Sequence, residues 1–139
     1  MSLARSDYPL AETRPDSVKG PRGKALADIT LDAVLAGDVT MEDLRITPTA
    51  LEAQAEIARA AGRPTLARNF KRAAELVNVP QAFIMEVYEL LRPGRAKSKE
   101  QLLAAARVLR TEHAAPAMAG FVEEAAEAYE QRGLFTFRF

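Results

Sequence analysis

The chain has 139 residues, of which 48% are hydrophobic and 27% charged, a composition typical of a folded globular protein and not of a disordered one. Its 19 Lys and Arg balance its 19 Asp and Glu, so there is no net charge to attract nucleic acid or an anionic membrane. It contains no Cys, which excludes a disulfide framework, a thiol nucleophile and a zinc–thiolate site and fits a cytoplasmic location.

The N-terminal residues 1–27 contain three prolines and two glycines and show no helical period. This composition predicts an extended arm with few internal hydrogen bonds. Ordering such an arm costs chain entropy, so we expect the arm to lie along another surface whose contacts compensate for that cost. The tripeptide Tyr8-Pro9-Leu10 is its one apolar cluster.

From Thr30 onward, the element boundaries are helix signals. Thr30 and Gly37 bound a first short helix, and Thr40 with Asp43 begins a second. Pro at the start and Gly after the end mark the longer helices. These helices are predicted over 48–61, 64–77, 80–91 and 116–132, with another beginning after Ser98.

The predicted fold class is therefore all-α, a compact bundle of about five to six short helices with an extended N-terminal arm. The expected organisation is an arm over 1–27, one helical domain over 28–133 and an apolar C-terminal tail over 134–139, in which Phe alternates with other residues. The many alanines of helix 48–61 predict close helix packing. Helix 80–91 carries a second apolar stripe, Ile84, Tyr88 and Leu91, which indicates a central helix or one covered by a partner.

The candidate catalytic groups are few. His113 is the only histidine. A general base needs a nucleophile or an orienting carboxylate placed beside it, whereas a histidine near a helix end, as here, is usually solvated. Glu123, Glu127 and Glu130 share a helix face and can in principle bind a hard cation, but a solvated face is favoured because no ligand loop accompanies them. We therefore assign no catalytic, cofactor-binding or metal-binding residue to this chain.

A basic stretch lies in the middle of the chain, where residues 57–74 contain no Asp or Glu. A phosphate-binding face is disfavoured because no aromatic residues interleave with the cations. A solvated face, or one that meets an acidic partner surface, is the better interpretation. The basic residues are Arg59, Arg63, Arg68, Lys71 and Arg72.

An ordered set of short segments resembles the small (gamma) subunit of the adenosylcobalamin-dependent diol and glycerol dehydratases. The resemblance covers roughly residues 7–132 and is densest in Asp43–Pro80. Its segments include Asp7-Tyr8-Pro9-Leu10-Ala11, Arg45-Ile46-Thr47-Pro48, Asn69-Phe70, Arg72-Ala73-Ala74-Glu75-Leu76 and Leu91-Arg92-Pro93.

The resemblance implies a helical subunit that supplies no catalytic side chain and packs on a large TIM-barrel subunit, within a dimer of heterotrimers with large and medium subunits. The large subunit would hold substrate and a metal ion, and adenosylcobalamin would lie between the large and medium subunits. A substrate radical would then drive loss of water from propane-1,2-diol, glycerol or ethane-1,2-diol, giving an aldehyde.

Six residues in the arm and loops are the candidate interface residues, namely Tyr8, Pro9, Leu10, Arg45, Arg92 and Pro93. The chain departs from the family at Gly94, where an aromatic residue is usual, and in its Phe-rich end. It begins close to the Asp-Tyr-Pro-Leu block, so any microcompartment association is expected through partner subunits. A free-standing helical adaptor is the alternative function.

Overall fold

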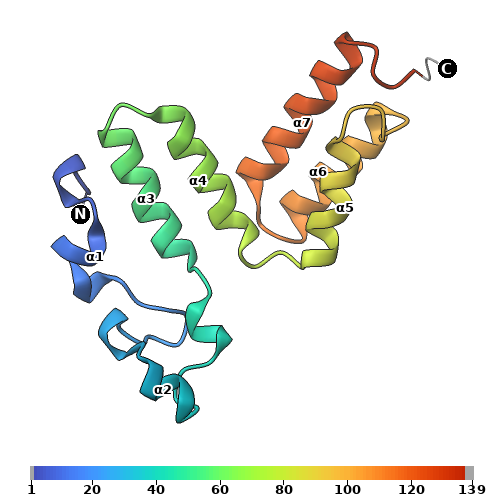
Figure 1. Cartoon of the computed structure of the whole chain (residues 1–139). Coiled ribbons are helices and arrows are strands. Elements are labelled where there is room, and N and C mark those ends of the chain that lie inside the picture. The colour runs from blue at the N-terminus through green and yellow to red at the C-terminus, as the bar shows by residue number, and fades with distance from the viewer. Residues whose placement is uncertain (1, 137–139) are drawn as a thin grey trace. The chain divides into compact units, whose positions relative to one another are not determined.

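A computed structural model describes residues 2–136 (Figure 1). Within that range the secondary structure is helical, apart from one isolated bridge between Lys19 and Ala25, which confirms the all-α prediction. The α-helices are α1 (Leu10–Thr13), α2 (Leu31–Leu35), α3 (Pro48–Ala60), α4 (Pro64–Leu76), α5 (Gln81–Leu91), α6 (Lys99–Thr111) and α7 (Pro116–Gln131). The 3-10 helices are η1 (Arg5–Asp7), η2 (Pro15–Ser17), η3 (Leu26–Asp28) and η4 (Met41–Leu44).

The predicted capping residues are confirmed where the structure places a side-chain bond. The Thr30 hydroxyl accepts from the Ala33 amide at 3.2 Å, and the Thr47 hydroxyl accepts from the Ala50 amide at 3.1 Å. Ser98 accepts from the Gln101 amide at 3.4 Å. These bonds satisfy amides that the first helical turn leaves without a partner, which is why the sequence locates the helix starts.

The chain divides into two compact units, Met1–Val77 and Asn78–Phe139. The boundary follows the end of α4, inside the range 28–133 that the sequence assigned to one helical domain. Each unit has its own buried core of helical side chains.

The core of the first unit lies between α3 and α4, which Figure 1 shows side by side and joined by a short connection. Ala55, Ala58 and Ala67 are buried there, and Leu66 and Phe70 pack against them. Alanine side chains let two helices approach closely, so the alanine-rich sequence correctly predicted tight packing.

The N-terminal segment differs from the extended arm that its composition predicted. Between Arg5 and Asp28 it forms η1, α1, η2 and η3, separated by turns. Asp7 holds one of these turns, because its carboxylate accepts from the Ala4 amide at 2.7 Å and from Arg14 Nε at 2.9 Å. Each turn closes within three to four residues, too short a span to produce a helical period in the sequence.

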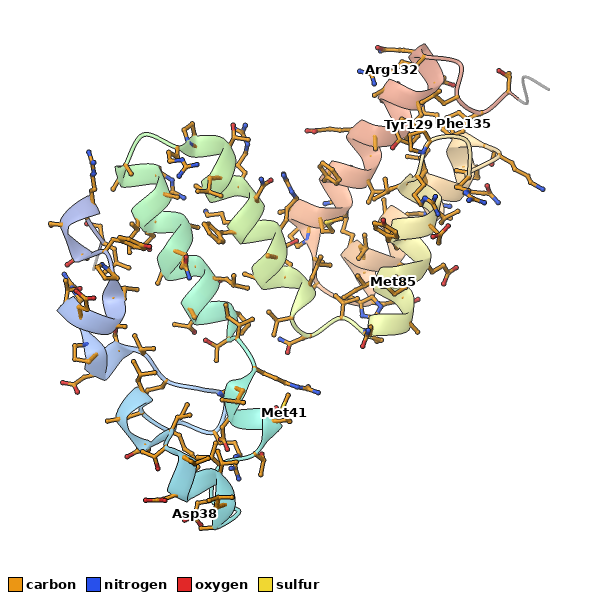
Figure 2. All side chains as sticks on the ribbon, in the orientation of Figure 1. Asp38, Met41, Met85, Tyr129, Arg132 and Phe135 are labelled. Atoms are coloured by element: carbon orange, nitrogen blue, oxygen red, sulfur yellow. The ribbon has the colours of Figure 1, made fainter. Side chains whose placement is uncertain are left out.

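The core of the second unit lies between α6 and α7, with α5 against α6. Leu102, Leu109 and Val122 are its largest fully buried side chains. At the end of α7, Tyr129 donates a hydrogen bond to the Leu91 carbonyl, and its ring lies 6.3 Å from that of Phe135 (Figure 2). The remaining phenylalanines of the predicted tail, Phe137 and Phe139, lie outside the described residues.

Candidate partner-binding surfaces

Three predicted interface residues lie together at the end of η1 and the start of α1. Tyr8 is 68% exposed, and a cis peptide bond joins it to Pro9. Pro9 and Leu10 are half-buried. The exposed aromatic ring is the residue of this group that a partner can reach, and amphipathic rings of this kind are enriched in protein interfaces.

The other three predicted interface residues lie elsewhere in the chain. Arg45, at the end of η4 in the first unit, pairs with Glu42 at 3.3 Å. Arg92, at the end of α5 in the second unit, pairs with Glu89 at 3.1 Å, and Pro93 next to it is exposed. Both ion pairs are exposed, so neither arginine is held strongly and both are accessible.

Seven of the exposed large apolar residues lie in the segment 26–46, called here the apolar segment. None of these seven was among the predicted interface residues, although Arg45 lies in the same segment. Three of its residues, Leu31, Val34 and Leu35, share one face of α2, and Leu31 and Leu35 are 72% and 77% exposed. Met41, which is labelled in Figure 2, is 76% exposed. The exposed set is Leu26, Leu31, Val34, Leu35, Met41, Leu44 and Ile46.

The sequence carried a signal for this region, because large apolar residues are dense in it while its helices are short. A helix of five residues cannot cover its own apolar face, and nothing in the local pattern supplies a second long helix to pack on it. Concentrated exposed apolar side chains are typical of a surface that binds another protein.

The apolar segment is anchored by an ion pair whose carboxylate is buried. Asp43 is 2% exposed, and it accepts from Arg22 Nε at 2.8 Å and from the Thr40 amide at 2.9 Å. The Arg22 hydrogen bond and the Thr40 amide lower the pKa of Asp43 to about 2, because both stabilise the charged carboxylate. Asp43 is therefore ionised at neutral pH and fixes η4 to the N-terminal segment.

The second apolar stripe predicted on helix 80–91 is partly exposed. Tyr88 is 57% exposed, whereas Ile84 and Leu91 are half-buried. Met85 is a further exposed apolar residue of α5 at 51% (Figure 2). The second unit therefore also presents apolar side chains to a partner, although fewer than the apolar segment does.

The candidate cation site on α7 is occupied by basic side chains of α6. Arg110 pairs with Glu123 at 2.9 Å, and Lys99 contacts both Glu127 and Glu130 at 2.7 Å. The two glutamates raise the pKa of Lys99 by hydrogen bonding, so it remains a cation. Within residues 2–136 there is no group of three or more His, Asp or Glu side chains that could hold a metal ion.

The only histidine packs against an aromatic ring. The rings of His113 and Phe83 lie 5.3 Å apart at an interplanar angle of 36°, and His113 is half-buried. We expected a solvated histidine near a helix end, whereas the structure places the His113 ring against Phe83 of α5. This stacking gives His113 a packing role that accounts for its position.

No helix in the part of the chain that the structure describes is long and apolar enough to cross a membrane.

The short helices and the exposed apolar segment are features typical of a chain that packs on other subunits. A family model described as dehydratase small subunit matches residues 3–136, and the chain belongs to this family. It is 51% identical to the propanediol dehydratase small subunit of Salmonella typhimurium over 127 residues, which cover 91% of this chain and 73% of that protein. It is 50% identical to the propanediol dehydratase small subunit of Citrobacter freundii over 127 residues, with the same coverage.

Proposed function

We propose that this chain is the structural small subunit of an adenosylcobalamin-dependent diol dehydratase, and that it packs on the large catalytic subunit. The observation that carries the proposal is the exposed apolar segment in a chain of the dehydratase small-subunit family. Exposure of this many large apolar side chains favours self-association in an isolated protein, whereas a partner subunit would remove them from water.

The chemistry would lie in the partner subunits. In the proposed complex, a dimer of heterotrimers, the large and medium subunits bind substrate, metal ion and adenosylcobalamin. Adenosylcobalamin bound there would supply the radical chemistry for loss of water from a 1,2-diol such as propane-1,2-diol or glycerol, which would give an aldehyde. This chain contributes no side chain to these steps. The complex would work in the cytoplasm, with any microcompartment association through the partner subunits.

The six predicted interface residues would contact the partner subunits from both units of the chain. Tyr8 and Arg92 are the two whose side chains are most useful to test, because one is an exposed ring and the other a cation in an exposed pair. If both Tyr8→Ala and Arg92→Ala co-purify with the large subunit as the wild type does, these interface assignments are wrong.

Reconstitution tests the proposed function. The large and medium subunits of the same dehydratase are expressed with and without this chain, and adenosylcobalamin-dependent aldehyde formation is measured from propane-1,2-diol and from glycerol. We expect a stable three-subunit complex and full activity only when this chain is present. If the other two subunits assemble and turn over normally while this chain stays free, the chain is better explained as a helical adaptor.

A further inference from the structure

A pocket of about 480 Å³ lies in the first unit, where η1 meets α3 and α4. This volume is within the range of about 300–1,000 Å³ that is typical of ligand-binding clefts. Its apolar wall is formed by Ile57 and Ala58, which are buried, and by Leu66 and Phe70, which are half-buried. The remaining lining residues are Arg5, Tyr8, Gln54, Ala61 and Arg63.

The polar side of this pocket is positive. Arg5 and Arg63 line it, and no Asp or Glu does. Among the described residues, neither guanidinium has a carboxylate within 4 Å. The pocket therefore combines an apolar wall with two cations that have no carboxylate partner in the part of the chain that the structure describes.

The acidic groups near η1 are engaged in other contacts. Glu56 accepts from the Leu3 amide at 3.0 Å, and Asp7 pairs with Arg14 at 2.8 Å. Residues 57–74, which supply most of the lining, contain no Asp or Glu. Among the described residues, neither Glu56 nor Asp7 therefore pairs with Arg5 or Arg63.

We propose that this pocket receives an apolar side chain from an acidic segment of a partner dehydratase subunit, with a neighbouring carboxylate on Arg5 and Arg63. Arginine suits this role because its planar guanidinium can bind a carboxylate through two hydrogen bonds. Tyr8 at the rim would pack on the inserted segment with its exposed ring. The inference rests on the proposed function, since it requires partner subunits, and it adds a specific anchoring site to that function.

The charged half of the proposal is tested with a double reversal, Arg5→Glu with Arg63→Glu. The matched control is Arg59→Glu with Lys71→Glu, which makes the same change in net charge at exposed residues outside the pocket. The dissociation constant for the co-expressed large and medium subunits is measured at about 0.1 M and about 1 M salt, where the Debye length is about 10 and 3 Å.

We expect the pocket double variant to bind about tenfold or more weakly at the lower salt, because like charges would then face each other. The control pair should stay within about twofold of wild type, and the difference should shrink at high salt. Equal weakening by both pairs would mean that only the general charge of this face matters, and the pocket proposal would be overturned.

The apolar half is tested by filling the pocket. Ala61, the residue after the end of α3, lines the pocket and is exposed, so Ala61→Phe can occupy it. Ala60→Phe places the same ring at the last residue of α3, which is exposed and does not line the pocket. Circular dichroism and a thermal melt establish that both variants fold. Weaker binding by Ala61→Phe alone supports the proposal, and equal binding by the two variants contradicts it.

The occupant is identified by placing a photoreactive phenylalanine analogue at Tyr8 in the reconstituted complex and mapping the cross-linked peptide by mass spectrometry. A partner-subunit peptide with an apolar residue beside Asp or Glu is the expected product. A cross-link to a second copy of this chain, or to a peptide without a carboxylate, overturns the inference. If the wild-type chain and every pocket variant bind the large and medium subunits equally well, the pocket proposal fails and the proposed function stands. If the wild-type chain does not bind these subunits, both the pocket proposal and the proposed function fail.

Discussion

Arg22 and Asp43 form an ion pair that links two segments 21 residues apart, with Arg22 Nε 2.8 Å from Asp43 Oδ1. The Asp43 side chain is fully buried, whereas that of Arg22 is 47% exposed. Arg22 also donates to the Asp38 carbonyl at 3.0 Å. Arg22, which lies in the turn before η3, therefore contacts both the turn that follows α2 and η4, and it links the N-terminal segment to the apolar segment.

We predict that Asp43→Asn destabilises the chain. The amide cannot accept as many hydrogen bonds as the carboxylate, so it leaves Arg22 or the Thr40 amide without its partner. Thermal unfolding should show a Tm several degrees below that of wild type. Glu52→Gln, an equivalent change at an exposed site, is the control and should leave the Tm nearly unchanged. An unaltered Tm in Asp43→Asn would mean that the buried pair contributes nothing net.

The contribution of Asp43 should depend on pH in a defined direction. Its pKa is about 2 in the folded chain and 3.8 ordinarily, so the folded state favours the ionised form. The stabilisation is complete above pH 3.8 and is lost as the pH falls toward about 2. The Tm difference between wild type and Asp43→Asn should therefore be constant near neutral pH and close on acidification. A difference that widens in acid would refute this assignment.

Gly20 lies against the backbone of Asp43 and should not tolerate a side chain. A Cβ at Gly20 would lie 2.6 Å from the Asp43 carbonyl oxygen, so the two segments would have to separate. We expect Gly20→Ala to cost about 1–3 kcal/mol in the free energy of unfolding, measured by urea denaturation. In contrast, Gly120→Ala has open space around it in α7 and should stabilise by about 0.5–1 kcal/mol. The same sign for both substitutions would contradict the steric explanation.

Leu102 and Leu31 offer a direct comparison of a core leucine with an exposed one. Leu102 is fully buried in α6, and Leu102→Ala should cost about 2–5 kcal/mol because it leaves a cavity. Leu31 is 72% exposed, and Leu31→Ala should change the free energy of unfolding by less than about 0.5 kcal/mol. Denaturation of the two isolated variants measures both values, and a large loss for Leu31→Ala would show that its side chain is covered.

The apolar segment should affect assembly more than folding. Leu35→Ser with Met41→Ser removes two large exposed apolar side chains. We expect less self-association of the isolated chain by light scattering, and binding to the partner subunits that is weaker by about tenfold or more, since buried apolar anchors dominate interface energies. Ala36→Ser, at an exposed neighbouring position, should change neither quantity. Unchanged binding by the double variant would place the interface elsewhere.

Local sequence signals were sufficient to predict the longer helices of this protein and to recognise its family. Thr47 and Pro64 mark helix starts, and Gly62 follows a helix end. Each acts on backbone within four residues of its own position, so these helix boundaries can be predicted from the sequence alone. The short turns of the N-terminal segment escaped prediction, because each closes within one turn and produces no period.

Which side chains are covered depends on the tertiary structure and could not be predicted from local patterns. The face of α2 formed by Leu31, Val34 and Leu35 has the spacing of a core face, yet in the described part of the chain it is exposed. The buried contact of Arg22 with Asp43 and the pocket beside Arg63 likewise depend on how distant segments meet. Such contacts join residues that share no local period, so sequence patterns alone cannot locate them.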